Sequence, residues 1–143
     1  MFVYLVMIPG LVVIMPSVLT KEIRLGVLLP ITGRWPIGTR IAAAVPLATS
    51  DVMNDATLLP GYNITYEIVD SSCEPEQGLR GMVGFKGVDL FIGPACSVVV
   101  EPAALLAKIW NKPIITYAAS SNKFINKNVY STPWYYNGVR TTQ

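Results

Sequence analysis

Histidine is absent from the 143 residues of this chain. Its absence excludes catalytic triads built on an imidazole, metal sites with imidazole ligands, and the side chain that most often switches its charge near neutral pH. Charged residues are scarce as well, at 14%, and the formal net charge of +2 comes without any run of one sign. A nucleic-acid-binding surface needs clustered basic residues, so nucleic acid is not an expected partner.

Phosphate-binding motifs are also missing, because neither G-x-G-x-x-G nor G-x-x-x-x-G-K-[ST] occurs. An α/β sheet without such a loop is a poor dinucleotide site. Asp70, Asp89 and Glu101 fall near the ends of expected strands, but no nucleophile accompanies them. We therefore expect solvated or capping roles for these carboxylates, no catalytic centre and no metal site.

The first segment, Met1–Thr20, carries no charge and ends at Lys21. A signal peptide has a short apolar core, whereas a membrane anchor needs about 20 apolar residues in one continuous helix. Pro9-Gly10 and Pro16 interrupt this stretch, and Pro16-Ser17 suits a cleavage region. We predict a secretory signal peptide over residues 1–20, with a signal-anchor as the alternative.

Either kind of N-terminal segment would export the remainder of the chain. The chain has two cysteines, Cys73 and Cys96. In an oxidising compartment such a pair would be bridged.

Apolar runs and helical periodicity alternate along residues 21–143. The expected strands are Ile23–Leu29, Tyr62–Val69, Val88–Ile92, Pro113–Tyr117 and a short fifth strand at Val129–Ser131. The expected helices are Arg40–Asn54, Glu74–Phe85 and Ser97–Trp110. This alternation predicts an α/β fold: an open parallel sheet of four to five strands with helices on both faces.

The first expected helix carries an apolar stripe, Ile41, Val45, Ala48 and Val52, at three- and four-residue spacing. Pro46 indicates that the regular helix begins there, since proline is tolerated in a first turn. Three glycines at residues 78, 81 and 84 interrupt the second helix, each at a cost of about 1 kcal/mol relative to alanine. The sequence offers no account of them.

A ligand crevice is expected after the third strand. The apolar run ends at Gly93-Pro94, a small polar segment with Cys96 follows, and a helix opens at Ser97, a good capping residue. Open α/β sheets bind ligands where the carboxyl ends of strands meet helix N-termini. A second small polar turn, Ala118–Ser121, follows the fourth strand.

The order of several motifs carries a family resemblance. They are Leu58-Leu59-Pro60-Gly61-Tyr62, Asp70-Ser71-Ser72-Cys73, Ile92-Gly93-Pro94-Ala95-Cys96 and Asn111-Lys112-Pro113-Ile114-Ile115. Over about residues 22–132 the chain resembles the extracellular ligand-binding region of natriuretic-peptide-type receptors and receptor guanylate cyclases. This group shares the type I periplasmic-binding-protein fold with bacterial amino-acid binders and metabotropic glutamate receptors.

The resemblance implies that residues 21–143 are the first lobe only of a two-lobed ligand-binding domain, and hence an N-terminal fragment. The parent receptor would add a membrane span, a kinase-like region and a cyclase, so this chain itself is not an enzyme. It would bind an extracellular peptide as a homodimer at the plasma membrane, or be secreted if truncated. The alternatives are an exported amino-acid-type binding protein or class C receptor fragment, and a non-binding decoy.

The resemblance also implies a disulfide between Cys73 and Cys96, with the two preceding strands flanking the first strand in the order 2-1-3. A buried chloride beside that disulfide is a further implication. Its ligands would be the hydroxyl of Ser71 or Ser72 and the N–H groups of Ala95 and Cys96, a favourable arrangement at a helix start. No other cofactor is expected.

Three further groups of candidate site residues remain. Ser97, Ser120 and Ser121 occupy positions where amino-acid-binding relatives hold ligand. Asn63-Ile64-Thr65 is a sequon for N-glycosylation. Three aromatic residues, Trp35, Phe85 and Trp110, are candidate dimer contacts, with core packing as the alternative role.

Overall fold

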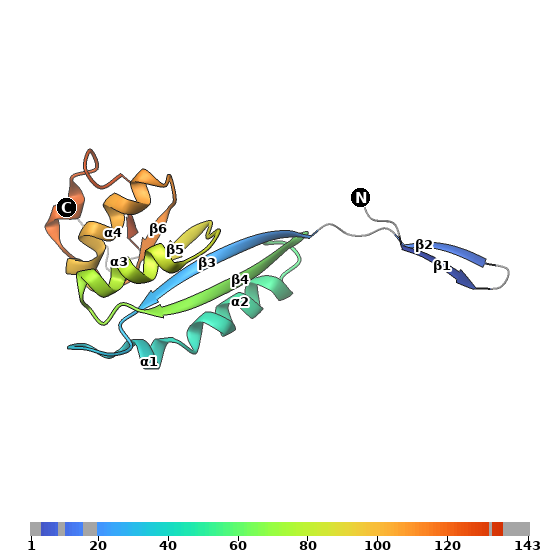
Figure 1. Ribbon diagram of the computed structural model, residues 1–143, viewed down its shortest axis with the longest axis horizontal. Coiled ribbons are helices and arrows are strands. Elements are labelled where there is room, and N and C mark those ends of the chain that lie inside the picture. The colour runs from blue at the N-terminus through green and yellow to red at the C-terminus, as the bar shows by residue number, and fades with distance from the viewer. Residues whose placement is uncertain (1–3, 9–10, 16–19, 132, 136–143) are drawn as a thin grey trace.

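The computed structural model describes residues 4–8, 11–15, 20–131 and 133–135. Its elements are β1 (Tyr4–Ile8), β2 (Leu11–Met15), β3 (Lys21–Leu29), α1 (Gly38–Ile41), α2 (Ala44–Asn54), β4 (Tyr62–Asp70), α3 (Pro75–Gly84), β5 (Leu90–Ile92), α4 (Ser97–Ile109), β6 (Ile114–Thr116), the 3₁₀ turn η1 (Asn122–Ile125) and β7 (Pro133–Tyr135). Figure 1 shows their arrangement.

A parallel sheet of five strands in the order β4-β3-β5-β6-β7 forms the centre of the fold. The predicted α/β class and the predicted flanking of the first long strand by the next two are both confirmed. β3 pairs with β4 from Lys21↔Tyr62 to Leu29↔Asp70, and with β5 at Leu25↔Leu90. Strand β3 therefore lies between β4 and β5 and pairs with both of them.

The N-terminal strands β1 and β2 form a separate antiparallel pair. The assignment of residues 1–20 to a signal peptide or signal-anchor concerns export and processing, and it stays a prediction. Within the ranges described above, the structure holds no helix with the length and apolar character needed to cross a membrane.

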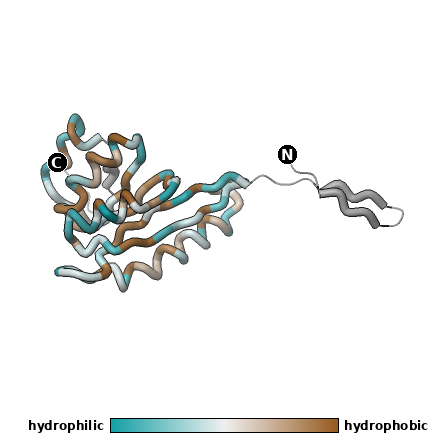
Figure 2. The backbone as a smooth tube through the Cα atoms, in the orientation of Figure 1, coloured by the Kyte–Doolittle hydropathy of each residue, from teal (hydrophilic) through white to brown (hydrophobic). Residues whose placement is uncertain are grey.

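Helices cover both faces of the sheet, as predicted. In Figure 1, α2 lies below β3 and β4, whereas α3 and α4 lie above these two strands. Because successive side chains of a strand point to opposite faces, Gly26 and Leu28 face α3 and α4, while Val27 and Leu29 face α2. Figure 2 shows hydrophobic residues concentrated along the strands in the middle of the molecule.

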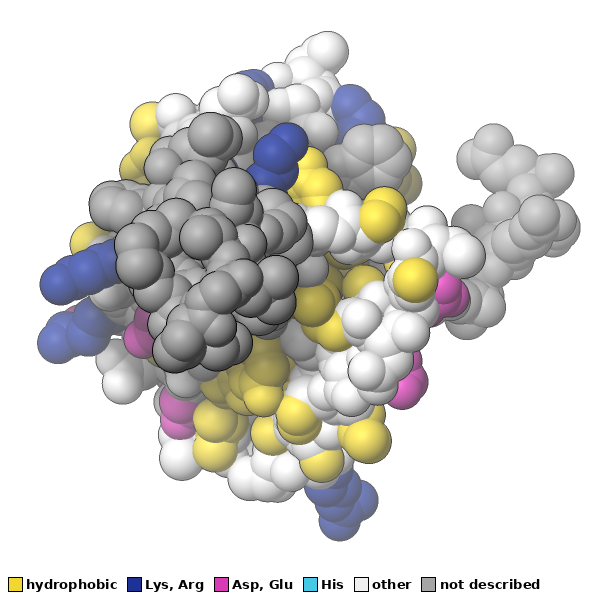
Figure 3. Space-filling model, turned by 90° about the vertical axis from the view of Figure 1, so that its right-hand side faces the viewer, with side chains coloured by type: hydrophobic (Ala, Val, Ile, Leu, Met, Phe, Trp, Pro, Cys, Tyr) yellow, Lys and Arg dark blue, Asp and Glu magenta, His cyan; other side chains and the backbone are white. Residues whose placement is uncertain are grey.

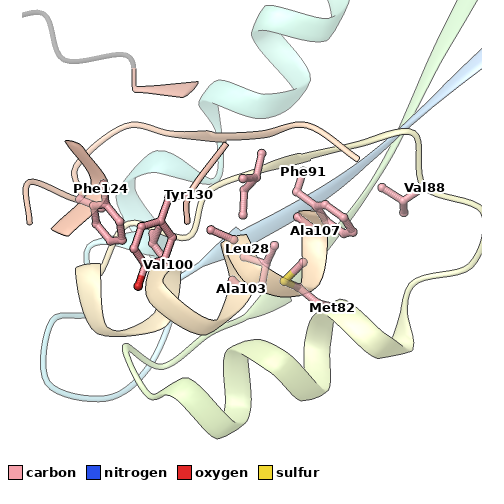
Figure 4. Packing of buried hydrophobic residues seen from close by; sticks show 12 residues of the cluster. Leu28, Met82, Val88, Phe91, Val100, Ala103, Ala107, Phe124 and Tyr130 are labelled. Carbon is pink, nitrogen blue, oxygen red and sulfur yellow. The ribbon is translucent and has the colours of Figure 1, made fainter. Parts of the chain in front are cut away.

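The packed core lies on the α3 and α4 side of the sheet. Its largest members include Leu28 from β3, Phe91 from β5 and Met82 from α3. Small residues of α4, among them Ala103 and Ala107, let that helix approach the strands closely (Figure 4). The core thus fixes β3 and β5 against α3 and α4.

The first predicted helix, Arg40–Asn54, is interrupted. It forms as the short turn α1 and the regular helix α2, and Pro46 occupies the first turn of α2 as predicted. The ring of Pro46 supplies no N–H, which is tolerated in a first turn because that group has no intrahelical acceptor.

The predicted fifth strand at Val129–Ser131 is wrong in position. The N–H groups of Val129 and Tyr130 donate to the Asn126 carbonyl, at 3.2 and 2.9 Å, so these residues form a turn and cannot pair with β6. Tyr130 is buried and meets the Phe124 ring edge-on at 5.3 Å between centroids. The fifth strand is β7, which pairs with β6 and lies four residues further along the chain than predicted.

Close packing explains two of the three glycines of α3. A Cβ atom on Gly78 would overlap the Cγ1 of Val99 on α4, and one on Gly81 would lie 2.7 Å from the Cγ2 of Val69 on β4. A Cβ atom on Gly84 would meet no other atom within 4 Å. Gly78 and Gly81 therefore let α3 lie against its neighbours, whereas the contacts of Gly84 do not require glycine.

We predict that Gly78→Ala lowers the free energy of unfolding by about 1–3 kcal/mol, because the new methyl group forces α3 away from α4. The matched control in the same helix is Gly84→Ala, which should raise it by a few tenths to about 1 kcal/mol. Urea denaturation of both variants measures the difference. Equal effects of the two substitutions would contradict the assigned α3–α4 contact.

Candidate ligand crevice at the carboxyl edge of the sheet

The turn after β5 is held on both sides. Gly93 has φ +85°, and a Cβ atom there would overlap the Leu28 carbonyl oxygen of β3. The Gly93 N–H donates to the Ile115 carbonyl at 2.7 Å, and the buried Thr116 hydroxyl donates to the Pro94 carbonyl, also at 2.7 Å. Glycine is needed for the sharp turn, and β3 and β6 hold it in place.

Cys73 and Cys96 form the disulfide that the family resemblance implied, with their Cα atoms 5.5 Å apart. Cys73 follows β4 and Cys96 follows β5, the two strands on either side of β3. Residues Ser72 and Cys73 adopt φ values of +49° and +60°, in the left-handed region that non-glycine residues enter only where the surroundings enforce it. This turn brings the loop after β4 inward to reach Cys96.

Asp70, the last residue of β4, organises the same edge. Its carboxylate accepts hydrogen bonds from the N–H groups of Ile31 and Ser72, at 2.8 and 2.7 Å, and from the hydroxyls of Thr32 and Ser72. Asp70 therefore fastens the loop after β3 to the turn that carries the disulfide. Sequence reasoning expected a solvated or capping carboxylate here, but Asp70 caps no helix; its partners lie in the loops after β3 and β4.

The pKa of Asp70 falls to about 2 from its ordinary value of 3.8. Partial burial acts in the opposite direction, but the hydrogen bonds from Thr32, Ser72 and Ile31 stabilise the ionised carboxylate and outweigh it. Asp70 is thus ionised throughout the physiological range.

The two candidate chloride-binding serines differ in their surroundings. Ser72 directs its hydroxyl to Asp70 and Thr32. Ser71 is fully buried, and its hydroxyl has no hydrogen-bond partner. Within the described part of the chain, no group accepts a hydrogen bond from the N–H of Ala95 or Cys96 either. Ser71, Ala95 and Cys96 therefore each keep an unused donor at this edge.

Two of the three candidate ligand serines are brought together. The N–H of Ser120, after β6, donates to the Ser97 hydroxyl at the start of α4 at 3.2 Å. Ser121 instead accepts a hydrogen bond from the Lys123 N–H at 3.4 Å and caps η1. Ser97 and Ser120 therefore line one position at the carboxyl edge, and Ser121 has a local structural partner.

The three candidate dimer contacts do not form one patch. Phe85 and Trp110 flank Phe91, with ring centroids 6.0 and 6.1 Å from it, before the amino ends of β5 and β6. Trp35, 42% exposed, lies in the loop after the carboxyl end of β3. Asn63 of the sequon is exposed on the edge strand β4.

Over the residues that the structure describes, no three His, Cys, Asp or Glu side chains lie close enough to hold a metal ion together.

Comparisons with known proteins agree with this architecture. The profile of the family described as "Receptor family ligand binding region" matches residues 40–143. The chain is 38% identical over 96 residues to the Resact receptor of Arbacia punctulata, covering 64% of this chain and 9% of that receptor. It is 29% identical over 115 residues to the gamma-aminobutyric acid type B receptor subunit 1 of Mus musculus, covering 78% and 12% respectively.

A third relative, guanylate cyclase D of Mus musculus, is 31% identical over 99 residues, which cover 65% of this chain and 9% of that protein. The chain therefore belongs to the family described as "Receptor family ligand binding region". It spans roughly a tenth of the length of these relatives, and the matched region is a ligand-binding one, not a catalytic one.

We predict that Asp70 makes stability depend on acid. A carboxyl whose pKa is about 2 in the folded state and 3.8 when unfolded stabilises the fold fully above the higher value and loses this contribution as the pH falls through the lower one. Because Asp70 is partly exposed to water, we expect a loss of about 1 kcal/mol across this window.

Asp70→Asn should remove this part of the acid dependence, whereas Asp51→Asn on exposed α2 should leave it intact. Urea denaturation at several pH values measures the free energy of unfolding of each variant as a function of pH. If the free energy of unfolding of Asp70→Asn still falls at low pH as it does in the unsubstituted protein, another carboxyl is responsible.

Proposed function

We propose that this chain is the first lobe of the extracellular ligand-binding region of a cell-surface receptor, of the receptor guanylate cyclase type, with an extracellular peptide as ligand. The observation that carries the proposal is the disulfide across the carboxyl edge, between Cys73 and Cys96, in a chain of this family. Such a bridge suits an exported protein and gives the crevice a rigid rim. The parent receptor would add a second lobe, a membrane span and the cyclase.

Similarity favours this class over the alternatives. The relatives include the Resact receptor, the Speract receptor of Strongylocentrotus purpuratus, at 33% identity, and guanylate cyclase D. The exposed Asn63 on edge strand β4 supports a glycan there, as an exported receptor would carry.

A homodimer of the parent receptor is part of the proposal. Val98, Leu105 and Ile109 of α4 are 55%, 40% and 78% exposed and follow helical spacing, so they form one apolar stripe. Val83 of the neighbouring α3 is 66% exposed. We define Val83, Val98, Leu105 and Ile109 as the α4 stripe. A second copy of this surface would remove these side chains from water, and a ligand could then act by rearranging the dimer.

An amino-acid-type ligand is the second candidate function. The likeness to the gamma-aminobutyric acid type B receptor subunit 1 favours it, as does the meeting of Ser97 and Ser120 beside the N-terminus of α4. A helix N-terminus with a hydroxyl nearby suits a carboxylate.

The deciding experiment expresses the parent receptor on cultured cells and measures cyclic GMP. We expect a response to size-fractionated peptides from the source animal and none to glutamate, glycine or gamma-aminobutyric acid. Leu105→Glu should abolish the response and shift the secreted extracellular region from dimer to monomer in light scattering, because it places a charge in the α4 stripe. Ile125→Glu, at an exposed residue of η1, is the control and should change neither.

A response to amino acids instead of peptides would assign the receptor to the second class. Absence of any response, with the receptor present at the cell surface, would favour the decoy.

A bound chloride beside the disulfide is also proposed. Its support is the buried, unpartnered Ser71 hydroxyl together with the free N–H groups of Ala95 and Cys96. We propose that these three donors hold the anion, with Ser71 rather than Ser72 supplying the hydroxyl, because the Ser72 hydroxyl is already bonded to Asp70. The ion would stabilise the turns that the disulfide joins.

We predict that replacing gluconate by chloride at constant ionic strength raises the Tm of the secreted receptor region by about 3–6 °C, as expected for binding at about ten times Kd. Ser71→Ala should abolish this rise and leave the Tm in gluconate unchanged or higher, because it removes an unpaired buried hydroxyl. Ser50→Ala on exposed α2 should keep the rise. A chloride-dependent rise that survives Ser71→Ala would contradict the assignment.

A further inference from the structure

Strand β4 is a free edge of the sheet. It has nine residues and pairs with β3 along its whole length and, within the described residues, with no other strand. Its other side therefore presents a row of backbone N–H and C=O groups without partners. No residue of β4 is buried. Such an edge can pair with a strand of another molecule, so native proteins protect it.

The side chains of β4 favour this kind of pairing. Residues 62–69 are mainly β-branched and aromatic, the types with the highest β propensity. Lysine and proline, which often protect edge strands, do not occur in β4, and Glu67 is its one charged residue before Asp70. Figure 3 shows the side of the molecule where β3 and β4 begin, with hydrophobic side chains gathered in the lower half and charged ones scattered without a continuous patch. Charge therefore gives this edge little protection.

The glycosylation sequon lies on the same strand. Asn63 is the second residue of β4 and is exposed, and Asn63-Ile64-Thr65 is the one sequon in the 143 residues. An N-linked glycan is bulky and strongly hydrated, so it does not fit beside a strand that pairs with a second strand. A glycan on Asn63 would thus supply the protection that the side chains of β4 lack.

A polar groove lies next to Asn63 along β4, on the α3 side of the sheet. It has a volume of about 210 Å³, and its lining includes Arg24 of β3, Thr65 and Glu67 of β4, and Lys86 after α3. Because alternate residues of a strand share one face, Asn63 lies on the same face as Thr65 and Glu67. Charged and hydroxyl groups are hydrogen-bonding partners for sugar hydroxyls. The first sugars of a glycan on Asn63 could therefore bind along the strand instead of projecting away from it.

We propose that Asn63 carries an N-linked glycan whose first sugars lie in this groove, and that this glycan prevents β4 from pairing with β4 of a second molecule. The inference rests on the proposed function in one respect, because it requires an exported chain. Asn63 lies near the amino end of β4, whereas the candidate crevice lies beyond its carboxyl end, so the glycan leaves the crevice accessible.

Peptide mapping by mass spectrometry tests whether Asn63 is modified. The sample is the secreted extracellular region of the parent receptor, expressed in animal cells. We expect a glycan on Asn63 in most molecules. A secreted receptor region with an unmodified Asn63 would overturn the proposal.

Asn63→Gln tests the shielding, because it removes the glycan and leaves an uncharged side chain on the edge. We expect loss of soluble protein on incubation and a shift to larger species in sedimentation. Thr65→Ser keeps the sequon and should behave as the unsubstituted protein does. Asn63→Lys also removes the glycan but places a charge on the edge, so it should stay soluble. An Asn63→Gln protein that stays soluble, or an Asn63→Lys protein that is lost in the same way, would overturn the proposal.

A relocated glycan separates shielding of the edge from general solubility. Asn128→Thr creates a sequon at Asn126, and both residues are exposed in the connection from β6 to β7, on the other side of the sheet from β4. Combined with Asn63→Gln, this substitution should not restore the soluble protein. Full restoration would overturn the proposal, because a glycan at any position would then serve.

Photo-crosslinking identifies the surface that associates. The residue p-benzoylphenylalanine replaces Tyr66, which is 39% exposed on β4, or, as the control, Leu47, which is 65% exposed on α2. In Asn63→Gln we expect the Tyr66 position to link to β4 of a second molecule and the Leu47 position not to. The glycosylated protein should show neither link. A link from the Tyr66 position to another element of the second molecule would overturn the proposal.

These outcomes are independent of the ligand. A receptor whose glycan shields β4 but which answers no peptide would refute the proposed function alone. A receptor that answers peptides but carries no sugar on Asn63 would refute this inference alone.

Discussion

The disulfide between Cys73 and Cys96 joins the loop after β4 to the loop after β5, across the end of β3. The candidate crevice depends on this constraint. Strands on either side of a central strand lie about 10 Å apart. The Cα atoms of Cys73 and Cys96 are nevertheless 5.5 Å apart, because the turn after β4 leans inward. Asp70 holds the same turn to the loop after β3. The disulfide and Asp70 together therefore join the loops after β3, β4 and β5 at the carboxyl edge of the sheet.

The two faces of the sheet differ in how completely they are packed. The α4 side is a finished core, with Leu28, Phe91 and Val100 buried. The α2 side holds a cavity and the buried hydroxyl of Tyr117, which has no hydrogen-bond partner in the described part of the chain. Helix α2 has no buried residue, so it covers its side of the sheet only in part.

Much of the fold could be predicted from local pattern. Alternating apolar runs and helical periodicity located four strands and three helices, and the resemblance supplied the pairing of Cys73 with Cys96. The fifth strand was misplaced, because Val129 and Tyr130 read as a β pattern although their N–H groups are used in a turn. The role of Asp70 in joining two loops was not predicted, since its donors Ile31 and Thr32 lie far from it in sequence.

The sequence by itself determined the order of elements, the family and the residues of the carboxyl edge, because these follow from periodicity, turn chemistry and short motifs. Only the tertiary structure decided that Ser71 and not Ser72 keeps a free hydroxyl, that Gly78 and Gly81 serve close helix contacts, and that the stripe of α2 is left half covered. Each of these depends on which atoms from distant segments come within contact distance, and no local pattern records that.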